Sequence, residues 1–291
     1  MIVKDIRPRG FCKGVHFAIE KVKEVLKSNN YPKPIYVLGY IVHNRHVVDE
    51  LTEMGAITLD DHSMSRMELI EGISEGTIVI SAHGTPIDVI NKIKEKRLTL
   101  VDATCQDVYV THDLIKSYLN KNYHVVYIGK KNHPETNASL SLGNKVFLIE
   151  NVEDVNHSHI EEPIFVTNQT TFSIKDIFNI HLALKEKYQD IIITEEICNA
   201  TRIRQNAIIK SNEDADLCYI VGDTRSNNSK NLAKISRQMT NTRTILIQSV
   251  DDINPLDLKD VQLVTVSSGA STPEYLTKEV ISYLKTFSNE N

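Results

Sequence analysis

Short apolar segments alternate with amphipathic helical segments along the whole chain. The apolar segments are rich in Val and Ile and end in polar or glycine-containing turns. Strands are predicted at residues 35–39, 77–81, 98–101, 124–128, 145–149, 164–167, 190–194, 217–221, 244–247 and 262–266. Helices are predicted between them, for example at 15–27, 89–96, 174–188 and 273–283. This alternation is typical of βαβ units, so the pattern predicts an α/β fold with small, mainly parallel sheets.

One local pattern, a strand followed by a cysteine and then a helix, occurs three times. It contains Cys12, Cys105 and Cys198, and the intervals 105 − 12 and 198 − 105 are both 93 residues. A chain of 291 residues divides into three units of 97, so the period predicts three similar α/β lobes. We expect lobe 1 at 13–104, lobe 2 at 105–197 and lobe 3 at 198–291, with residues 1–12 forming an N-terminal strand that leads to the first cysteine.

Two further loops recur in each third, each shortly after a predicted strand. In an open parallel sheet, ligands meet the loops at the carboxyl ends of the strands. If the lobes pack around one axis, these matched loops face a common centre, which predicts pseudo-threefold symmetry. One set of loops contains His43, His133 and Ser226, and the other contains His83, Thr170 and Ser271.

Composition and charge exclude several classes of function. Hydrophobic residues make up 41% of the chain and charged residues 24%, as in ordinary globular proteins. The net charge of −5 provides no basic footprint for nucleic acid. No apolar run reaches membrane-spanning length and the N-terminal residues lack a signal-peptide core, so we expect a cytoplasmic protein without a membrane partner. The chain contains no GxxxxGK[ST] or GxGxxG motif, which argues against a nucleotide cofactor.

The periodic cysteines differ from Cys218, which lies inside an apolar strand and reads as a small buried hydrophobe. Three thiolates that converge on one axis provide an all-sulfur metal site, and such ligands select zinc, copper(I) or iron–sulfur clusters. A 4Fe–4S cluster normally takes four cysteines, so with three, one iron keeps an open position and can act as a Lewis acid. Zinc completed by a histidine is the rival interpretation.

The polar residues of the recurring loops are suited to an anion. Imidazole, hydroxyl and amide donors near helix N-termini add to the free backbone N–H groups and to the helix dipole. This set of donors favours a small phosphate or diphosphate ester. Glu135 is the one carboxylate of these loop motifs, and it can deliver protons beside an open iron. Its alternative role is to cap the helix that follows Pro134.

The same residues carry a resemblance to a known family. Taken together, they resemble the 4-hydroxy-3-methylbut-2-enyl diphosphate reductases, the last enzymes of the non-mevalonate isoprenoid pathway. The matching motifs occur in family order: 8–15 (PRGFCKGV), 42–44 (VHN), 81–84 (SAHG), 102–105 (DATC), 133–135 (HPE), 169–171 (QTT), 197–201 (ICNAT), 226–228 (SNN) and 269–271 (GAS).

The resemblance implies three α/β lobes around one 4Fe–4S cluster held by Cys12, Cys105 and Cys198. The fourth iron would bind the substrate hydroxyl. Two electrons from ferredoxin or flavodoxin, together with protons, would remove that hydroxyl as water, and protonation of the allyl intermediate would produce isopentenyl or dimethylallyl diphosphate. Glu135, Thr170 and His133 would be catalytic, with Glu135 in the proton relay. The diphosphate would be bound by His43, His83, His133, Thr170, Ser226, Asn227, Asn228 and Ser271.

Three positions depart from the family pattern. Gln106 replaces a usual proline, Ala138 replaces a glycine and Asn227 replaces a common serine. None of these changes removes a proposed ligand or the acid. Two other interpretations stay open: a zinc-dependent phosphoesterase that uses the same cysteines, and a non-catalytic iron–sulfur redox sensor.

Overall fold

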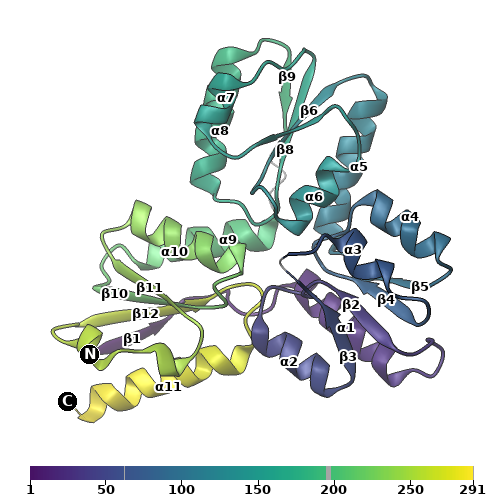
Figure 1. The fold of residues 1–291 in the computed structure, drawn as a ribbon. Coiled ribbons are helices and arrows are strands. Elements are labelled where there is room, and N and C mark those ends of the chain that lie inside the picture. Colours follow the sequence, from purple (N-terminus) through teal and green to yellow (C-terminus); the bar gives the residue numbers. More distant parts are fainter. Residues whose placement is uncertain (62, 195–197, 291) are drawn as a thin grey trace. The chain divides into compact units, whose positions relative to one another are not determined.

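The computed structural model describes residues 1–290 apart from 62 and 195–197. In the described residues the strands form three four-stranded sheets, and every strand pairing is parallel (Figure 1). This confirms the predicted α/β class. The predicted limit of lobe 2 at residue 197 and the chain end at 291 lie outside the described residues. The predicted lobe boundaries stay a prediction.

The first sheet has the strand order β3-β2-β4-β5. One of its two central strands, β4, is buried along its whole length, and three of its four residues are apolar, as expected for a strand that is covered on both faces. Around it, the strands and helices of this part of the chain are α1 (Lys13–Lys27), β2 (Ile35–Leu38), α2 (Arg45–Glu53), β3 (Ala56–Leu59), α3 (Arg66–Glu71), β4 (Thr77–Ile80), α4 (Ile87–Glu95) and β5 (Thr99–Asp102).

The second sheet has the order β7-β6-β8-β9. Apolar side chains cover both of its faces, one with Val126 and Val166 and the other with Tyr127 and Phe165. Its elements are α5 (Gln106–Asn120), β6 (His124–Ile128), α6 (Pro134–Leu140), β7 (Val146–Ile149), α7 (Val152–His157), β8 (Ile164–Asn168), α8 (Ile174–Lys187) and β9 (Ile191–Ile193).

The third sheet has the order β1-β12-β10-β11, so it joins the first strand of the chain to the last. Helices α9 and α10 lie on one side of this sheet and α11 lies on the other (Figure 1). Its elements are β1 (Ile2–Asp5), α9 (Asn199–Ser211), β10 (Leu217–Val221), α10 (Asn227–Met239), β11 (Arg243–Ile247), β12 (Leu263–Ser268), α11 (Glu274–Glu290) and two 3₁₀ turns, η1 (Val250–Asp252) and η2 (Pro255–Leu258).

All three sheets share one topology. In each, the strand that leads to a cysteine is at the edge: β5 leads to Cys105, β9 to Cys198 and β1 to Cys12. The two other recurring loops follow the two central strands, where the strand order reverses. This switch point is where open parallel sheets bind ligands. The repeat seen in the sequence therefore corresponds to a repeat in strand order.

Some elements differ from the sequence expectation. Strand β3 was not predicted, and α11 extends to Glu290 beyond the expected end at 283. The polar segments that begin at Asn151 and Ser249 each open a helical turn with a capping box. In each, the side-chain oxygen of the cap residue accepts an N–H of the first turn, from Asp154 or from Asp251, and a carboxylate accepts the N–H of the cap residue. These hydrogen bonds fix the start of the turn.

The chain forms two compact units. Unit 1 comprises residues 1–13, 43–46 and 198–291, and unit 2 comprises 14–42 and 47–197. The third sheet thus belongs to unit 1, and the first and second sheets belong to unit 2. No helix of the described chain is both long enough and apolar enough to cross a membrane.

Candidate functional site

The three periodic cysteines lie where an edge strand gives way to a helix. Cys105 and Cys198 are the N-cap residues of α5 and α9, and Cys12 directly precedes α1. All three are partly accessible. Cys218, in contrast, is 0% exposed inside β10, and burial raises the pKa of its thiol. The prediction that Cys218 is a buried core residue is confirmed.

Within unit 2, the first turn of α1 approaches the sulfur of Cys105 closely. A Cβ built on Gly14 would collide with Cys105 Sγ and lie 3.1 Å from Cys105 Cβ. Only glycine leaves room at this position. The positive end of a helix dipole therefore lies against this sulfur, and it favours the anionic thiolate, which is the form that binds metal.

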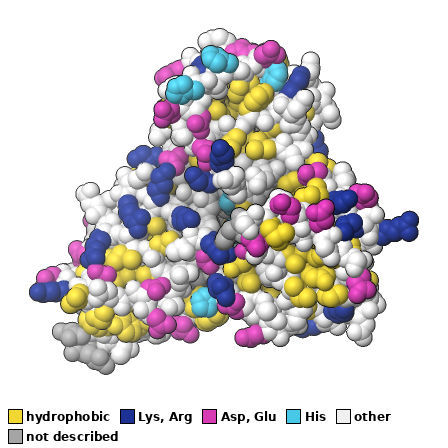
Figure 2. Space-filling model, viewed as in Figure 1, with side chains coloured by type: hydrophobic (Ala, Val, Ile, Leu, Met, Phe, Trp, Pro, Cys, Tyr) yellow, Lys and Arg dark blue, Asp and Glu magenta, His cyan; other side chains and the backbone are white. Residues whose placement is uncertain are grey.

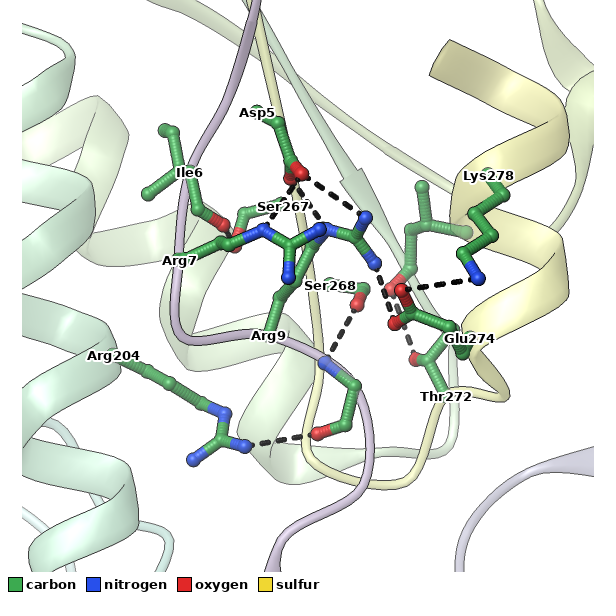
Figure 3. A network of polar contacts seen from close by, with 12 residues as sticks. Asp5, Ile6, Arg7, Arg9, Arg204, Ser267, Ser268, Thr272, Glu274 and Lys278 are labelled. Atoms are coloured by element: carbon green, nitrogen blue, oxygen red, sulfur yellow. Dashed lines mark hydrogen bonds and ion pairs between the residues drawn. The ribbon is translucent and has the colours of Figure 1, made fainter. Parts of the chain in front are cut away.

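Within unit 1, Arg204 connects the segments that carry the other two cysteines. It is 5% exposed on α9, and its guanidinium donates to the carbonyl oxygen of Gly10 at 2.9 Å (Figure 3). It also donates to the carbonyl oxygen of Ala200 at 3.0 Å. Burial lowers the pKa of Arg204, whereas the negative charges of Cys12 and Cys198 act in the opposite direction. A buried cation close to two thiols is suited to a centre that carries negative charge.

A salt-bridge network fixes the segment that leads to Cys12 (Figure 3). The side chain of Arg9 is 2% exposed and binds Asp5 at 2.5 Å and Glu274 at 2.7 Å. Gly10 has a φ of +71° and donates its N–H to Ser268 Oγ at 3.0 Å. The turn before the cysteine is therefore held against β12 and the start of α11.

The polar loops of unit 1 lie together. Ser271 Oγ donates to the carbonyl oxygen of His43 at 3.0 Å and lies 3.3 Å from Ser226 Oγ. Asn228 Oδ1 accepts the N–H of Ala270 at 2.8 Å. Ser226 is also the N-cap of α10, and Asn227 is its first residue. Unit 1 therefore brings together the predicted binding residues His43, Ser226, Asn227, Asn228 and Ser271.

Unit 2 brings the other two predicted histidines together. The rings of His83 and His133 are 5.5 Å apart and perpendicular. His133 is the N-cap of α6, and its Nδ1 accepts the N–H of Glu135 at 3.2 Å. This hydrogen bond requires Nδ1 to be without a proton, so the ring N–H lies at Nε2.

Glu135 is buried at the switch point of the second sheet, 1% exposed. Thr170 donates its N–H to one carboxylate oxygen at 2.7 Å and its hydroxyl to the other at 2.9 Å, and Tyr127 Oη lies 3.4 Å from the first. Burial raises the pKa of Glu135 to about 7, and these hydrogen bonds act in the opposite direction. A carboxyl group with this pKa can both give and take a proton near neutral pH.

The sequence left open whether Glu135 acts as a helix cap. The structure assigns the cap of α6 to His133, while the carboxylate of Glu135 points to Thr170 on another strand end. The capping alternative is therefore wrong for this side chain.

Three residues that contact these loops were not found from the sequence: Tyr127 in β6, Arg204 in α9 and Arg66 in α3. Arg66 donates to the Gly84 carbonyl and to Thr85 Oγ1, both at 2.7 Å, and so fixes the loop that carries His83. Its guanidinium is enclosed, and the loss of hydration lowers its pKa to about 10. An arginine in a short helix and a tyrosine in an apolar strand carry no local signal of such roles.

One known protein family matches nearly the whole chain. The family model described as LytB protein matches residues 3–285. The chain belongs to the LytB family. A curated relative from Geobacillus sp. (strain WCH70), named 4-hydroxy-3-methylbut-2-enyl diphosphate reductase, is 44% identical over 99% of this chain and 91% of its own length. A relative with the same name from Anoxybacillus flavithermus is 43% identical over 100% of this chain and 92% of its own.

Solved structures agree with this LytB-family assignment. The E-1-hydroxy-2-methyl-but-2-enyl-4-diphosphate reductase from Plasmodium falciparum superposes with a TM-score of 0.90 at 35% identity, over 98% of this chain and 88% of that chain. A second structure, described as the terminal enzyme of the non-mevalonate pathway, has a TM-score of 0.67 at 28% identity, over 98% and 100% of the two chains. The resemblance found from the sequence motifs is confirmed.

Proposed function

We propose that this chain is a 4-hydroxy-3-methylbut-2-enyl diphosphate reductase that forms isopentenyl and dimethylallyl diphosphate. The names of relatives that match nearly the full chain support this activity. The observation that carries it is the buried Glu135, whose pKa of about 7 and hydrogen bonds to Thr170 are suited to proton delivery.

The donor set fits an iron–sulfur cluster. Cys12, Cys105 and Cys198 provide three soft ligands at helix N-termini, and Gly14 and Arg204 surround them with groups that favour negative charge. When bound, a 4Fe–4S cluster with three cysteine ligands supplies single electrons and one iron that can accept a hydroxyl oxygen. Convergence of the three lobes on one pseudo-threefold axis is part of this proposal.

The diphosphate is bound, in this proposal, by the polar loops of both units. His43, Ser226, Asn227, Asn228 and Ser271 provide donors from unit 1, and His83 and His133 provide them from unit 2. The imidazole of His133 and the N-termini of α6 and α10 are suited to phosphate oxygens. The diphosphate thereby holds the rest of the substrate near Glu135 and Thr170.

Glu135 and Thr170 act on the hydroxyl that leaves. In the overall reaction, the substrate takes up two electrons and two protons, its C–O bond breaks, one C–H bond forms and water is released. The protonated carboxyl of Glu135 supplies a proton to the departing oxygen, and the Thr170 hydroxyl orients that carboxyl group.

We infer a cytoplasmic enzyme that takes electrons from ferredoxin or flavodoxin.

The test is anaerobic purification followed by iron and sulfide analysis and turnover with a reduced dye. We expect brown protein with about four irons per chain and conversion of the hydroxy-diphosphate to both products. Glu135→Gln should keep the iron and the substrate affinity but lose about 10²–10⁴-fold in kcat, while Glu153→Gln on exposed α7 should match the wild type. Colourless zinc protein, or a loaded cluster without turnover, would reject the proposal.

A further inference from the structure

Helices α9 and α10 carry only positive charge. Three basic residues occur in each, and neither contains Asp or Glu. The other helices of ten or more residues, α1, α5, α8 and α11, all mix acidic with basic residues. Since the chain as a whole has a net charge of −5, this concentration of positive charge is local.

The exposed basic side chains form one stripe on each helix. Arg202 and Lys210 are eight residues apart on α9, and Lys230 and Arg237 are seven apart on α10, spacings that place each pair on one face. The two helices pack against each other within unit 1, and Lys and Arg side chains gather over them in Figure 2. Within the described chain these four residues form no ion pair. We call them the basic face.

The basic face adjoins a proposed cluster ligand. Arg202 is one helical turn from Cys198, and its N–H donates to the Cys198 carbonyl oxygen at 3.1 Å. One turn is about 5 Å along the helix axis. A molecule that binds the stripe on α9 therefore contacts the helix that begins at this cysteine.

We propose that the basic face docks an acidic one-electron carrier protein that supplies the electrons of the reaction. This inference rests on the proposed function. Two carrier molecules each lose one electron for every substrate molecule that gains two electrons and two protons. A protein fits better than a nucleic acid because Ile203 and Met239, 43% and 45% exposed, add apolar area on the same two helices.

The test compares two electron sources on the anaerobically loaded enzyme. The variant Lys210→Glu/Lys230→Glu reverses two charges of the basic face. The matched control, Lys185→Glu/Lys285→Glu, makes the same charge change on exposed positions of α8 and α11. Turnover is measured with reduced flavodoxin and with a reduced viologen dye, in about 0.05 M and about 0.5 M salt, which changes the screening length severalfold.

At low salt the basic-face variant should show a KM for flavodoxin at least about tenfold above the control, since charge steering changes association rates by about 10–10³. High salt should shrink this difference, and dye-driven kcat should stay within about twofold of the control. Equal flavodoxin kinetics in the two variants would overturn the docking proposal. Loss of binding to a DNA duplex in the basic-face variant, with unchanged flavodoxin kinetics, would also overturn the docking proposal. Failure of the wild type with dye would instead reject the proposed function.

Discussion

Burial of Glu135 must reduce the stability of the folded chain at neutral pH. Its pKa is about 7 in the folded protein, against a usual value of 4.5. Between these two values the folded state holds a proton that the unfolded chain has lost, so the free energy of unfolding decreases as pH rises. Each pKa unit is worth about 1.4 kcal/mol, and the total is therefore about 3 kcal/mol, complete above pH 7.

The substitution Glu135→Gln removes this titration and keeps the shape of the side chain. Its amide oxygen can still accept the Thr170 N–H, which lies 2.7 Å from a carboxylate oxygen in the wild type. We therefore expect the variant to gain about 2–3 kcal/mol relative to wild type on going from pH 5 to pH 8. For a unit of this size, that corresponds to about 5–10 °C in Tm.

The measurement is the Tm of cluster-free protein from pH 5 to pH 8, by calorimetry. Glu153→Gln is the control, because Glu153 is exposed in α7 beside the same sheet. If the Tm difference between Glu135→Gln and wild type does not change with pH, or changes as in the control, Glu135 does not titrate near neutrality. Glu135 would then not be suited to donate a proton near neutral pH.

Three other substitutions test the remaining contacts. Thr170→Val removes a hydroxyl donor 2.9 Å from Glu135; a hydrogen bond to a charged group is worth about 1.5–3 kcal/mol, so the alkaline limb of the pH profile of kcat/KM should move up by roughly one to two pH units. Gly14→Ala should displace Cys105 and lower both iron content and Tm, whereas Gly72→Ala, where a Cβ meets nothing within 4 Å, should change neither. Arg204→Gln removes a positive charge near Cys12 and Cys198 and should lower the midpoint potential of the loaded cluster, measured in a redox titration monitored by electron paramagnetic resonance. Arg204→Lys keeps the charge and should keep most of the wild-type potential. Equal potentials in the three proteins would show that Arg204 acts only structurally.

Features that depend on local sequence could be predicted. The strands and the loops after them were found because each is a short apolar run that ends in polar residues, and the period of 93 revealed which loops correspond. Strand β3 (Ala56–Leu59) was missed because it begins directly after Gly55, where α2 has just ended, and its four residues alternate too briefly to stand out. The sequence also showed no sign that β1 joins the sheet of the last third, a pairing across some 260 residues.

The role of Glu135 is the clearest case of a feature that the sequence alone could not predict. Its identity and its place after Pro134 are local, and they left the choice between acid and cap open. The choice depends on hydrogen bonds from Thr170, 35 residues away, and on the burial of the Glu135 side chain. Tyr127 of β6 also contacts this carboxylate. The same holds for Arg204, whose partner Gly10 is 194 residues distant. A repeat in sequence can therefore identify which positions carry chemistry, but the pKa that makes one carboxylate useful arises from the burial that the folded chain imposes on it.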